Sequence, residues 1–310
     1  MKNEIPVYNL TGTRRFLPIA GSATIATGHC IYPNKLCTEK RNMTTTVLVM
    51  VDGFRPDALA EADCPHIQSL RARGSSTLSA TSVMPSITIP CHLSIFHSVP
   101  PSRHGITTNQ WQPMARPLPG LIEQAHAANL KSAFFHNWEP LRNLNSPGSL
   151  SFSYFRDNVY TDLEWGDHII ATEASRYIES DDPDFVFVYL GTVDTVGHMA
   201  GWMSDAYLQQ LERADKALGV LLHKLSDEYT ILLQSDHGGH ERSHGTDLPE
   251  DMTIPWMIAG PGIRAGYEIK GAVSLLDTAP TLARIMGIEP HREWEGTCVK
   301  ELFEKVEVNY

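Results

Sequence analysis

The sequence is poor in cysteine and lacks a long hydrophobic run. Its cysteines are odd in number and scattered, and no two form a Cys-x-x-Cys pair, which excludes a disulfide framework and a cysteine-based structural zinc site. They are Cys30, Cys37, Cys64, Cys91 and Cys298. Reduced thiols indicate a cytoplasmic protein. The longest apolar runs, at 46–51 and 185–190, are far shorter than the roughly 20 residues that span a bilayer, so we expect no membrane partner.

The sequence also lacks an excess of positive charge. Lysine and arginine number 25 against 36 aspartates and glutamates, which gives a formal net charge of −11. No basic stripe is visible, so charge-driven binding of a nucleic-acid polymer is excluded. The sequence leaves the oligomeric state open. The 310 residues suffice for one large α/β domain or two small ones.

The N-terminal residues 1–43 lack the periodicity of a folded segment and are rich in Thr, Gly, Pro and Asn. Residues 13–17 (TRRFL) resemble a twin-arginine export signal. The stretch that follows contains Pro18 and Gly21 and makes a poor hydrophobic segment for such a signal. We therefore predict a disordered or dispensable leader, with Met43 as an alternative start. Export is the alternative to a cytoplasmic location.

From residue 44 onward, short apolar runs alternate with amphipathic segments. Buried strands are predicted over 46–51, 132–136, 185–190, 229–234 and 254–259. Helices are predicted over 57–73, 88–98, 121–129, 161–180, 205–225 and 275–286. This alternation indicates an α/β fold with a mostly parallel central sheet flanked by helices on both faces. We expect one catalytic domain over 44–310, with a loop-rich, substrate-facing insertion around 137–158.

An aspartate follows three of the predicted strands. Asp52 follows the strand at 46–51, Asp194 comes after 185–190, and Asp236 comes after 229–234. In a parallel sheet, ligands bind beyond the carboxyl ends of the strands. Three strand-end carboxylates with nearby histidines are hard to explain as helix caps, so we predict a functional site there.

The histidines near these aspartates point to metal ions. His198 lies four residues after Asp194, a spacing that puts both side chains on one face of a helical turn. His237 directly follows Asp236, and the same loop adds His240 and His244. The sequence leaves open which of these loop histidines are spectators. Carboxylate and imidazole ligands suit Zn²⁺, with Mn²⁺ or Fe as alternatives, and this many ligands exceeds the needs of one ion. We therefore predict two divalent ions, a clamp suited to displacement at phosphorus.

Thr88 is the candidate nucleophile. It lies at the start of a predicted helix, just before Ile89 and Pro90, where free N–H groups and the helix dipole favour an anion. A metal ion would lower the pKa of its hydroxyl further. Ser86 and Cys91 are rivals, and a simple N-cap is the alternative role for Thr88.

Taken in order, these segments resemble the alkaline phosphatase superfamily, and within it most closely the type I phosphodiesterase/nucleotide pyrophosphatase enzymes. The resemblance runs from about Thr46 to Glu301. It rests on Asp52, 88–92 (TIPCH), 104–109 (HGITTN), 194–198 (DTVGH), 236–238 (DHG), 244–245 (HG), 260–262 (GPG) and 277–282 (DTAPTL).

The resemblance implies a role for each site residue. One metal ion would be held by Asp194, His198 and His244, and the other by Asp52, Asp236 and His237. Thr88 would be both nucleophile and a further ligand. Asn109 would hydrogen-bond a non-bridging phosphoryl oxygen alongside the Thr88 N–H. His244 is expected rather than His240, because the family's last histidine is followed by glycine.

The resemblance also implies an alkaline-phosphatase-like fold and an enzyme that hydrolyses phosphodiester or nucleotide pyrophosphate bonds through a phospho-threonine intermediate. The expected partner is therefore a small-molecule phosphate ester substrate. The sequence departs from the family at Cys91, where an asparagine is usual. Thr88 stands where sulfatases carry cysteine or serine, so the formylglycine route of sulfatases is not expected. The chain also lacks the cysteine-rich modules of the extracellular members.

Other functions stay open at the same site. A phosphomonoesterase or phosphonate hydrolase would be favoured if a lysine or arginine entered the pocket to meet extra negative charge, and the candidates are Arg103, Arg116, Lys131 and Arg142. A phospho-group transferase or a metal-binding protein without catalysis are further alternatives. Trp111 and Trp138 are candidates for stacking on a base or lining an apolar pocket.

Overall fold

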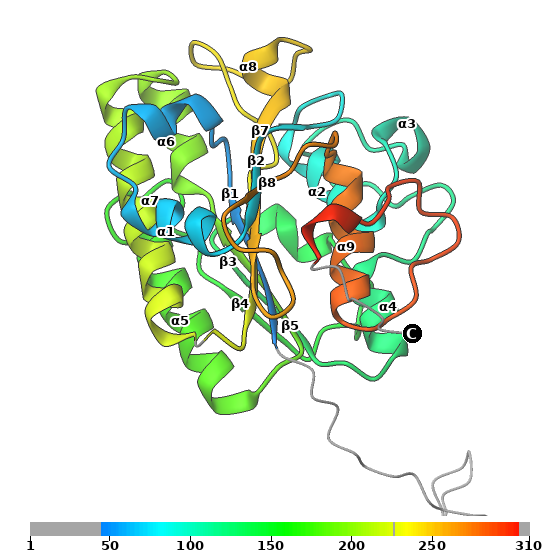
Figure 1. Ribbon diagram of the computed structural model, residues 1–310. Helices are drawn as coiled ribbons and strands as arrows, with labels where there is room; N and C mark the ends of the chain where they lie inside the picture. The colour runs from blue at the N-terminus through cyan, green and yellow to red at the C-terminus, as the bar shows by residue number, and fades with distance from the viewer. Residues whose placement is uncertain (1–44, 226, 304–310) are drawn as a thin grey trace, which may run out of the picture. The chain divides into compact units, whose positions relative to one another are not determined.

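A single central sheet organises the fold. The computed structural model describes residues 45–225 and 227–303, so the predicted leader, with Cys30 and Cys37, lies outside the described residues. The eight-stranded sheet has the order β4-β3-β5-β1-β6-β7-β2-β8 (Figure 1). Its strands are β1 (Thr46–Val51), β2 (Ser75–Thr81), β3 (Ser132–His136), β4 (Phe152–Phe155), β5 (Phe185–Leu190), β6 (Thr230–Gln234), β7 (Thr253–Ala259) and β8 (Tyr267–Glu268).

The sheet is mostly parallel, as the sequence predicted. Parallel pairs join β4, β3, β5, β1 and β6 in turn, and β2 pairs parallel with β8. Within the described chain, β7 alone is antiparallel to both of its neighbours, β6 and β2.

Helices cover both faces of the sheet (Figure 1). On β1, Val47, Val49 and Val51 pack into one hydrophobic core with α1, α5, α6 and α7, whereas Leu48 and Met50 pack into the other with α2, α4 and α9. The helices are α1 (Pro65–Arg73), α2 (Thr88–His97), α3 (Pro101–His104), α4 (Leu121–Ala127), α5 (Gly166–Asp181), α6 (Thr192–Ala200), α7 (Asp205–Lys224), α8 (Pro249–Met252) and α9 (Thr278–Ile285). Every helix in the described chain is too short or too polar to cross a membrane.

Three predicted helices have the wrong bounds, and two of them lie before residue 185. The helix predicted over 57–73 is two elements, the 3₁₀ helix η1 (Pro56–Ala60) and α1. Pro65 explains the break, because a proline disfavours helical backbone in the residue before it, and Cys64 has φ −118° and ψ 66°. The helix predicted over 161–180 begins only at Gly166, after a turn in which the Trp165 N–H donates to Asp162 Oδ1 at 3.0 Å.

The segment predicted as a loop-rich insertion around 137–158 contains two regular elements. These are the 3₁₀ helix η2 (Glu139–Asn143) and the edge strand β4. Most side chains of β4 are exposed, so the strand lacks the buried apolar pattern that identified its neighbours. The helix predicted over 275–286 likewise divides into the 3₁₀ helix η3 (Leu275–Asp277) and α9.

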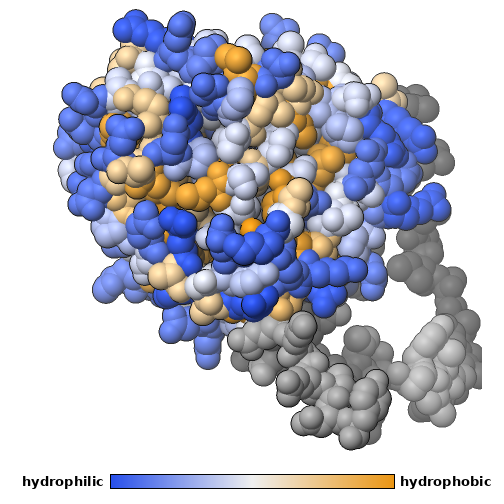
Figure 2. All heavy atoms as spheres, turned by 45° about the horizontal axis from the view of Figure 1, so that its top comes forward, coloured by the Kyte–Doolittle hydropathy of each residue, from blue (hydrophilic) through white to orange (hydrophobic). Residues whose placement is uncertain are grey.

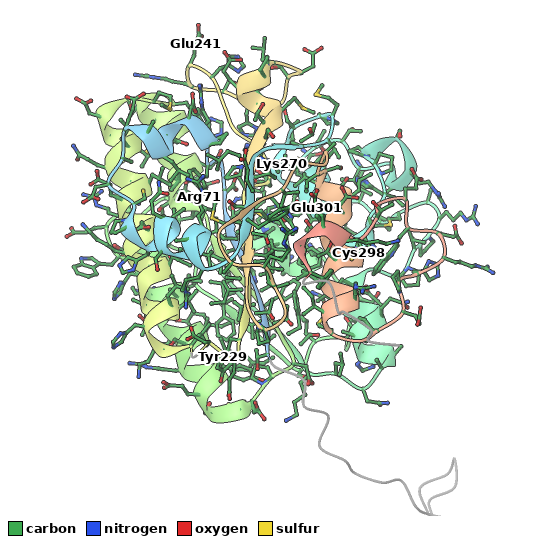
Figure 3. All side chains as sticks on the ribbon, in the orientation of Figure 1. Arg71, Tyr229, Glu241, Lys270, Cys298 and Glu301 are labelled. Carbon is green, nitrogen blue, oxygen red and sulfur yellow. The ribbon has the colours of Figure 1, made fainter. Side chains whose placement is uncertain are left out.

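The last described turn, η4 (Lys300–Leu302), is tied to the sheet edge through Glu301 (Figure 3). Its carboxylate accepts hydrogen bonds from the Tyr267 hydroxyl at 2.8 Å and from the backbone N–H groups of Lys270 and Gly271 at 3.2 and 2.7 Å. These contacts fix the end of the described chain next to β8.

Candidate metal centre and nucleophile

The candidate site lies where β1, β5 and β6 end. Asp52 directly follows β1, Asp236 follows β6 by two residues, and Asp194 lies in the first turn of α6, which follows β5. Gly53 has φ +70°, and a Cβ there would lie 3.0 Å from the Asp194 Cα, so only glycine lets these two segments approach so closely. Its N–H donates to Asp236 Oδ1 at 3.3 Å. The structure thus brings the three carboxylates together.

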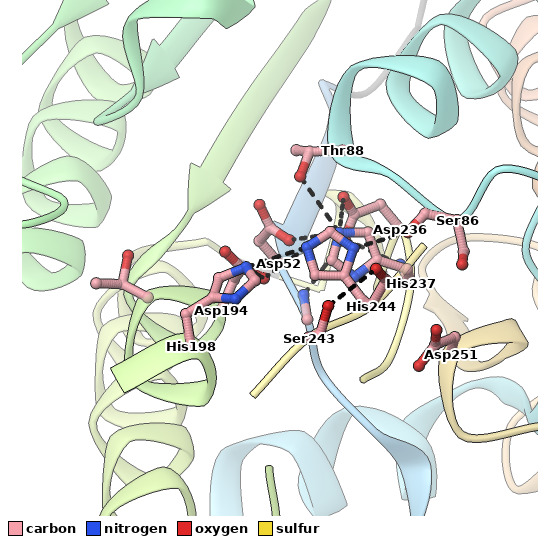
Figure 4. Close-up of polar contacts among 12 residues, drawn as sticks. Asp52, Ser86, Thr88, Asp194, His198, Asp236, His237, Ser243, His244 and Asp251 are labelled. Atoms are coloured by element: carbon pink, nitrogen blue, oxygen red, sulfur yellow. Dashed lines mark hydrogen bonds and ion pairs between the residues drawn. The ribbon is translucent and has the colours of Figure 1, made fainter. Parts of the chain in front are cut away.

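Asp194, His198 and His244 form one group of potential ligands (Figure 4). Asp194 and His198 lie one turn apart on α6, and His244 comes from the loop after β6. Asp194 Oδ1 lies 3.5 Å from Nε2 of each histidine, and the two Nε2 atoms are 3.1 Å apart. One atom from each residue lies within 4.8 Å of the others, close enough to share a metal ion.

Asp52, Asp236 and His237 form the second group, and all three are buried. His237 Nε2 lies 3.3 Å from Asp52 Oδ1 and 3.4 Å from Asp236 Oδ2. The His237 ring stacks on that of His244, with ring centres 3.7 Å apart, so the two groups adjoin each other.

The three histidines of the two groups share one tautomer. In each, Nδ1 lies 2.8–3.0 Å from a backbone carbonyl oxygen. Because a carbonyl only accepts, Nδ1 carries the proton and Nε2 keeps its lone pair for a ligand. The carbonyls are those of Arg242 for His198, Gly238 for His237 and Ser86 for His244.

The carboxylate oxygens and imidazole nitrogens of each group are arranged to bind a divalent cation. Asp52 Oδ1, Asp194 Oδ1 and Asp236 Oδ2 are buried without a hydrogen-bond partner, and each faces a histidine Nε2 lone pair. Burial raises the pKa of Asp194 and of Asp236 to about 7 and that of Asp52 well above its usual range, and neighbouring carboxylates add to each rise. Buried acceptors that face only other acceptors require positive charge between them.

Thr88 is the first residue of α2 and points toward the second group (Figure 4). Its Oγ1 lies 3.3 Å from His237 Nε2, and only 3% of the residue is exposed. The backbone N–H groups of the first helical turn have no acceptor within the helix. That of Ile89 donates to Asn109 Oδ1 at 3.0 Å, which leaves the amide Nδ2 of Asn109 available as a donor.

The loop that carries Asn109 is fastened to α2 by His104. Ile106 N–H donates to His104 Nδ1 at 3.1 Å, so Nε2 carries the proton and donates to Ser94 Oγ at 3.2 Å. His104 is 3% exposed, and it therefore acts as an anchor for the loop rather than as a ligand.

The rival residues are engaged elsewhere. Ser86 is fully buried, and its hydroxyl donates to the Thr246 carbonyl at 2.8 Å. Cys91 lies 3.3 Å from the Ser82 hydroxyl, and burial raises the pKa of its thiol well above the usual range. His240 pairs through Nδ1 with Asp251 Oδ1 at 2.7 Å and belongs to neither ligand group.

The four candidate cations also have other partners. Arg103 forms ion pairs with Glu293 and Glu295, and Arg116 also pairs with Glu293. Arg142 pairs with Glu139 on its own 3₁₀ helix. The Lys131 ammonium group donates to the backbone carbonyl of Asp181.

Of the candidate tryptophans, Trp111 is 53% exposed. Trp138 is partly buried and donates to the Tyr160 hydroxyl at 3.1 Å. Figure 2 looks onto the end of the molecule that carries α6 and α8, where hydrophobic residues lie interspersed among hydrophilic ones.

Tyr189 is a residue of the site that the sequence analysis missed. It lies in β5, fully buried, and its hydroxyl donates to Asp52 Oδ2. This bond orients the carboxylate so that Oδ1 faces His237. The sequence offered one indication of this role: Tyr189 is the one polar side chain in a strand otherwise made of valine, leucine and phenylalanine. A tyrosine buried in such a strand needs a hydrogen-bond acceptor for its hydroxyl.

Known proteins similar to this chain include phosphodiesterases, pyrophosphatases and phosphoglycerate mutases. The model of the family described as type I phosphodiesterase / nucleotide pyrophosphatase matches residues 46–118 and 112–251. A 2,3-bisphosphoglycerate-independent phosphoglycerate mutase of Clostridium perfringens is 27% identical over 137 residues, which cover 42% of this chain and 26% of that protein. An uncharacterized pyrophosphatase/phosphodiesterase of Schizosaccharomyces pombe is 26% identical over 219 residues, 63% of this chain and 44% of that protein. The chain thus spans less than half the length of these relatives.

A solved structure has the same fold. Human ectonucleotide pyrophosphatase / phosphodiesterase 5 superposes with a TM-score of 0.72 at 16% identity, covering 84% of this chain and all of that one. The alkaline-phosphatase-like fold expected from the sequence is confirmed.

Proposed function

The chain belongs to the type I phosphodiesterase/nucleotide pyrophosphatase family, and we propose that it is a dinuclear-metal hydrolase of phosphodiester or nucleotide pyrophosphate bonds, with Thr88 as nucleophile. Its catalytic unit would be a single domain over residues 44–310. One observation carries the proposal: the Thr88 hydroxyl lies 3.3 Å from His237 Nε2, beside two adjoining carboxylate–imidazole groups and at a helix N-terminus.

The two ligand groups would hold one cation each. Asp194, His198 and His244 would bind the first, and Asp52, Asp236 and His237 the second, with Thr88 as a further ligand. The mixture of carboxylate oxygen and imidazole nitrogen favours Zn²⁺, with Mn²⁺ or Fe as alternatives. When bound, such cations lower the pKa of a hydroxyl or a water and neutralise charge on phosphoryl oxygens.

The chain's own residues would carry a double displacement. Thr88 Oγ1 attacks phosphorus in line with the leaving oxygen, so that the Thr88–phosphorus bond forms as the bond to the leaving group breaks. The Thr88 proton passes to solvent, and the leaving oxygen takes up a proton in return. Water then attacks the phospho-threonine and releases Thr88 with its proton restored.

Neutral donors would stabilise the transition state. The Asn109 amide nitrogen and the Thr88 N–H lie at the start of α2, where the helix dipole favours developing negative charge on a non-bridging phosphoryl oxygen. Asn109 is oriented for this because its Oδ1 is already bonded to the Ile89 N–H.

The charge around the site favours diesters over monoesters. A monoester dianion carries one more charge than a diester, and the four basic residues considered as candidates to meet it are engaged with carboxylates or a carbonyl. We therefore place phosphomonoesterase and phosphonate hydrolase activities second. Thr88 at the nucleophile position argues against a sulfatase, because the formylglycine route begins from cysteine or serine.

A substrate panel tests this proposal. The panel is bis-p-nitrophenyl phosphate, p-nitrophenyl phosphate, phosphonoacetate, a nucleoside triphosphate and p-nitrophenyl sulfate, each with Zn²⁺ and with Mn²⁺. We expect the highest kcat/KM for the diester or the nucleotide, and negligible turnover of the sulfate. A higher kcat/KM for p-nitrophenyl phosphate or phosphonoacetate than for both of these would contradict the diester assignment.

A further inference from the structure

Trp202 is a buried residue that no step of the proposed reaction uses. It follows α6 by two residues and is 6% exposed. Its backbone N–H donates to the Glu241 carbonyl at 2.7 Å, which ties the end of α6 to the loop that carries His244. Its indole contacts three separate segments of the chain, and each of them bears candidate metal ligands.

The first contact is a hydrogen bond to the segment after β1. Trp202 Nε1 donates to the Gly53 carbonyl at 2.8 Å, and Gly53 directly follows Asp52. The Gly53 N–H in turn donates to Asp236 Oδ1. The indole N–H therefore holds Gly53, the residue that follows Asp52 in the chain and donates to Asp236.

The second and third contacts depend on two glycines. A Cβ on Gly197 would lie 2.6 Å from Trp202 Cε2, and a Cβ on Gly239 would lie 2.2 Å from the same atom. Gly197 precedes His198 on α6, and Gly239 lies in the loop between His237 and His244. No other residue type leaves room for an indole between α6 and this loop.

The indole also meets the two imidazoles of the first ligand group. Its ring lies edge-to-face against His198, with centroids 5.1 Å apart at 86°, and against His244 at 5.8 Å and 69°. Each imidazole is therefore held at Nδ1 by a carbonyl and on its ring by Trp202, and only Nε2 points toward the other ligands.

We propose that Trp202 is a positioning residue that clamps α6, the loop after β6 and the turn after β1, and so sets the affinity of the Asp194–His198–His244 group for a divalent cation. This rests on the proposed function only in assuming that the group binds a cation. Groups that fix the orientation of metal ligands commonly govern the affinity of the site.

Trp202→Phe tests the clamp without unfolding the site. The Gly53 carbonyl also accepts a hydrogen bond from the Tyr207 hydroxyl at 2.9 Å, so the substitution leaves no unpaired buried acceptor. The matched control is Trp294→Phe: Trp294 is 9% exposed, and its Nε1 donates to the Pro119 carbonyl at 3.0 Å, away from the ligand groups.

The readout is zinc affinity, measured on the full chain by titration in chelator-buffered Zn²⁺. We expect Trp202→Phe to weaken one of two zinc sites about 10-fold or more, and Trp294→Phe to leave both unchanged. The melting temperature in EDTA should fall less than the melting temperature with saturating Zn²⁺. Zinc affinities equal to wild type, or equal losses of melting temperature in both conditions, would overturn the proposal.

A second variant changes the residue of α6 against which the indole packs. Gly197→Ala places a methyl group where the indole lies, so it should also weaken zinc binding. In combination with Trp202→Phe the two losses should be less than multiplicative, because both act through the same contact. Fully multiplicative losses would contradict a shared clamp. Zinc binding without diester hydrolysis would instead count against the proposed function and leave the clamp intact.

Discussion

At the scale of single residues, the candidate site depends on where each histidine directs the lone pair of its Nε2 atom. His198, His237 and His244 each bond a carbonyl through Nδ1, and each directs Nε2 at an unpartnered carboxylate oxygen. His240 has the same side chain in the same loop but directs its Nδ1 at Asp251. The difference between the three proposed ligands and His240 is thus one of orientation.

This difference predicts opposite outcomes for two similar substitutions. His244→Ala should lower zinc content from about two ions per chain toward one and reduce kcat/KM for bis-p-nitrophenyl phosphate about 100-fold. His240→Ala should keep both ions. Zinc analysis and initial rates on the purified variants give the answer, and equal zinc loss in both would refute the assignment of His244.

The sequence predicted which residue types gather here, but left their roles to the family resemblance. Asp52, Asp194 and Asp236 were found because each follows an apolar run. Tyr189 and Trp202 were not found, because their roles arise from hydrogen bonds to groups that are distant in sequence, at Asp52 and Gly53. Nothing local in the sequence marks such partners.

At the scale of elements, α6 matters most, because it carries two of the three potential ligands in the first group. Its start is fastened by Asp167, a buried residue of α5. Asp167 Oδ2 accepts from the Thr192 hydroxyl at 2.5 Å, and Oδ1 accepts from Asn137 Nδ2 at 2.8 Å. Burial raises the pKa of this carboxyl to about 6, so it is mostly ionised above neutral pH.

Loss of this fastening should be costly. We expect Asp167→Ala to lower the free energy of unfolding by about 2–4 kcal/mol, because it leaves the buried donors of Asn137 and Thr192 unpaired. Asp227→Ala is the control and should cost less than about 1 kcal/mol, because the Asp227 side chain is 94% exposed in its pair with Arg73. Urea unfolding at pH 8 measures both, and similar values for the two would contradict this role.

Element prediction succeeded where burial was continuous. The strands at 46–51, 132–136 and 185–190 have the predicted bounds, and all their residues are buried. β2 was missed because its sequence, SSTLSAT, is polar and only partly buried. Helix starts failed at Pro65 and at the turn before Gly166, where single residues override the apolar periodicity.

At the scale of the whole molecule, alternating strands and helices were enough to predict the fold class. They were not enough to predict the strand order or the reversal of β7, because strand order depends on which faces pack together. Part of the net charge of −11 lies in the candidate site. Three of the negative charges are the aspartates of the ligand groups, Asp52 and Asp236 buried and Asp194 partly buried, where bound divalent cations would offset them.

The aspartates of the ligand groups predict how pH acts on the metal-free protein. Asp194 and Asp236 have a pKa of about 7 in the fold, against 3.8 as the ordinary value. Between these values the folded chain binds protons that the unfolded chain has lost, so the free energy of unfolding falls as the pH rises through this window. Burial lowers the pKa of His92, His104 and His244, which acts in the opposite direction below about pH 6.5. In EDTA, the melting temperature should therefore fall between about pH 6.5 and pH 8, and added Zn²⁺ should remove most of that fall. A melting temperature that rises with pH across this window in EDTA would contradict the clustering of these carboxyls.

The central claim is that Thr88 attacks phosphorus beside two metal-binding groups. Its most direct test is kcat/KM for bis-p-nitrophenyl phosphate in Thr88→Ala, with zinc content measured on the same samples. The account predicts a loss of at least about 10³-fold with near-normal zinc content, because the six carboxylate and imidazole ligands remain while the nucleophile is gone. Wild-type kcat/KM in Thr88→Ala would contradict it.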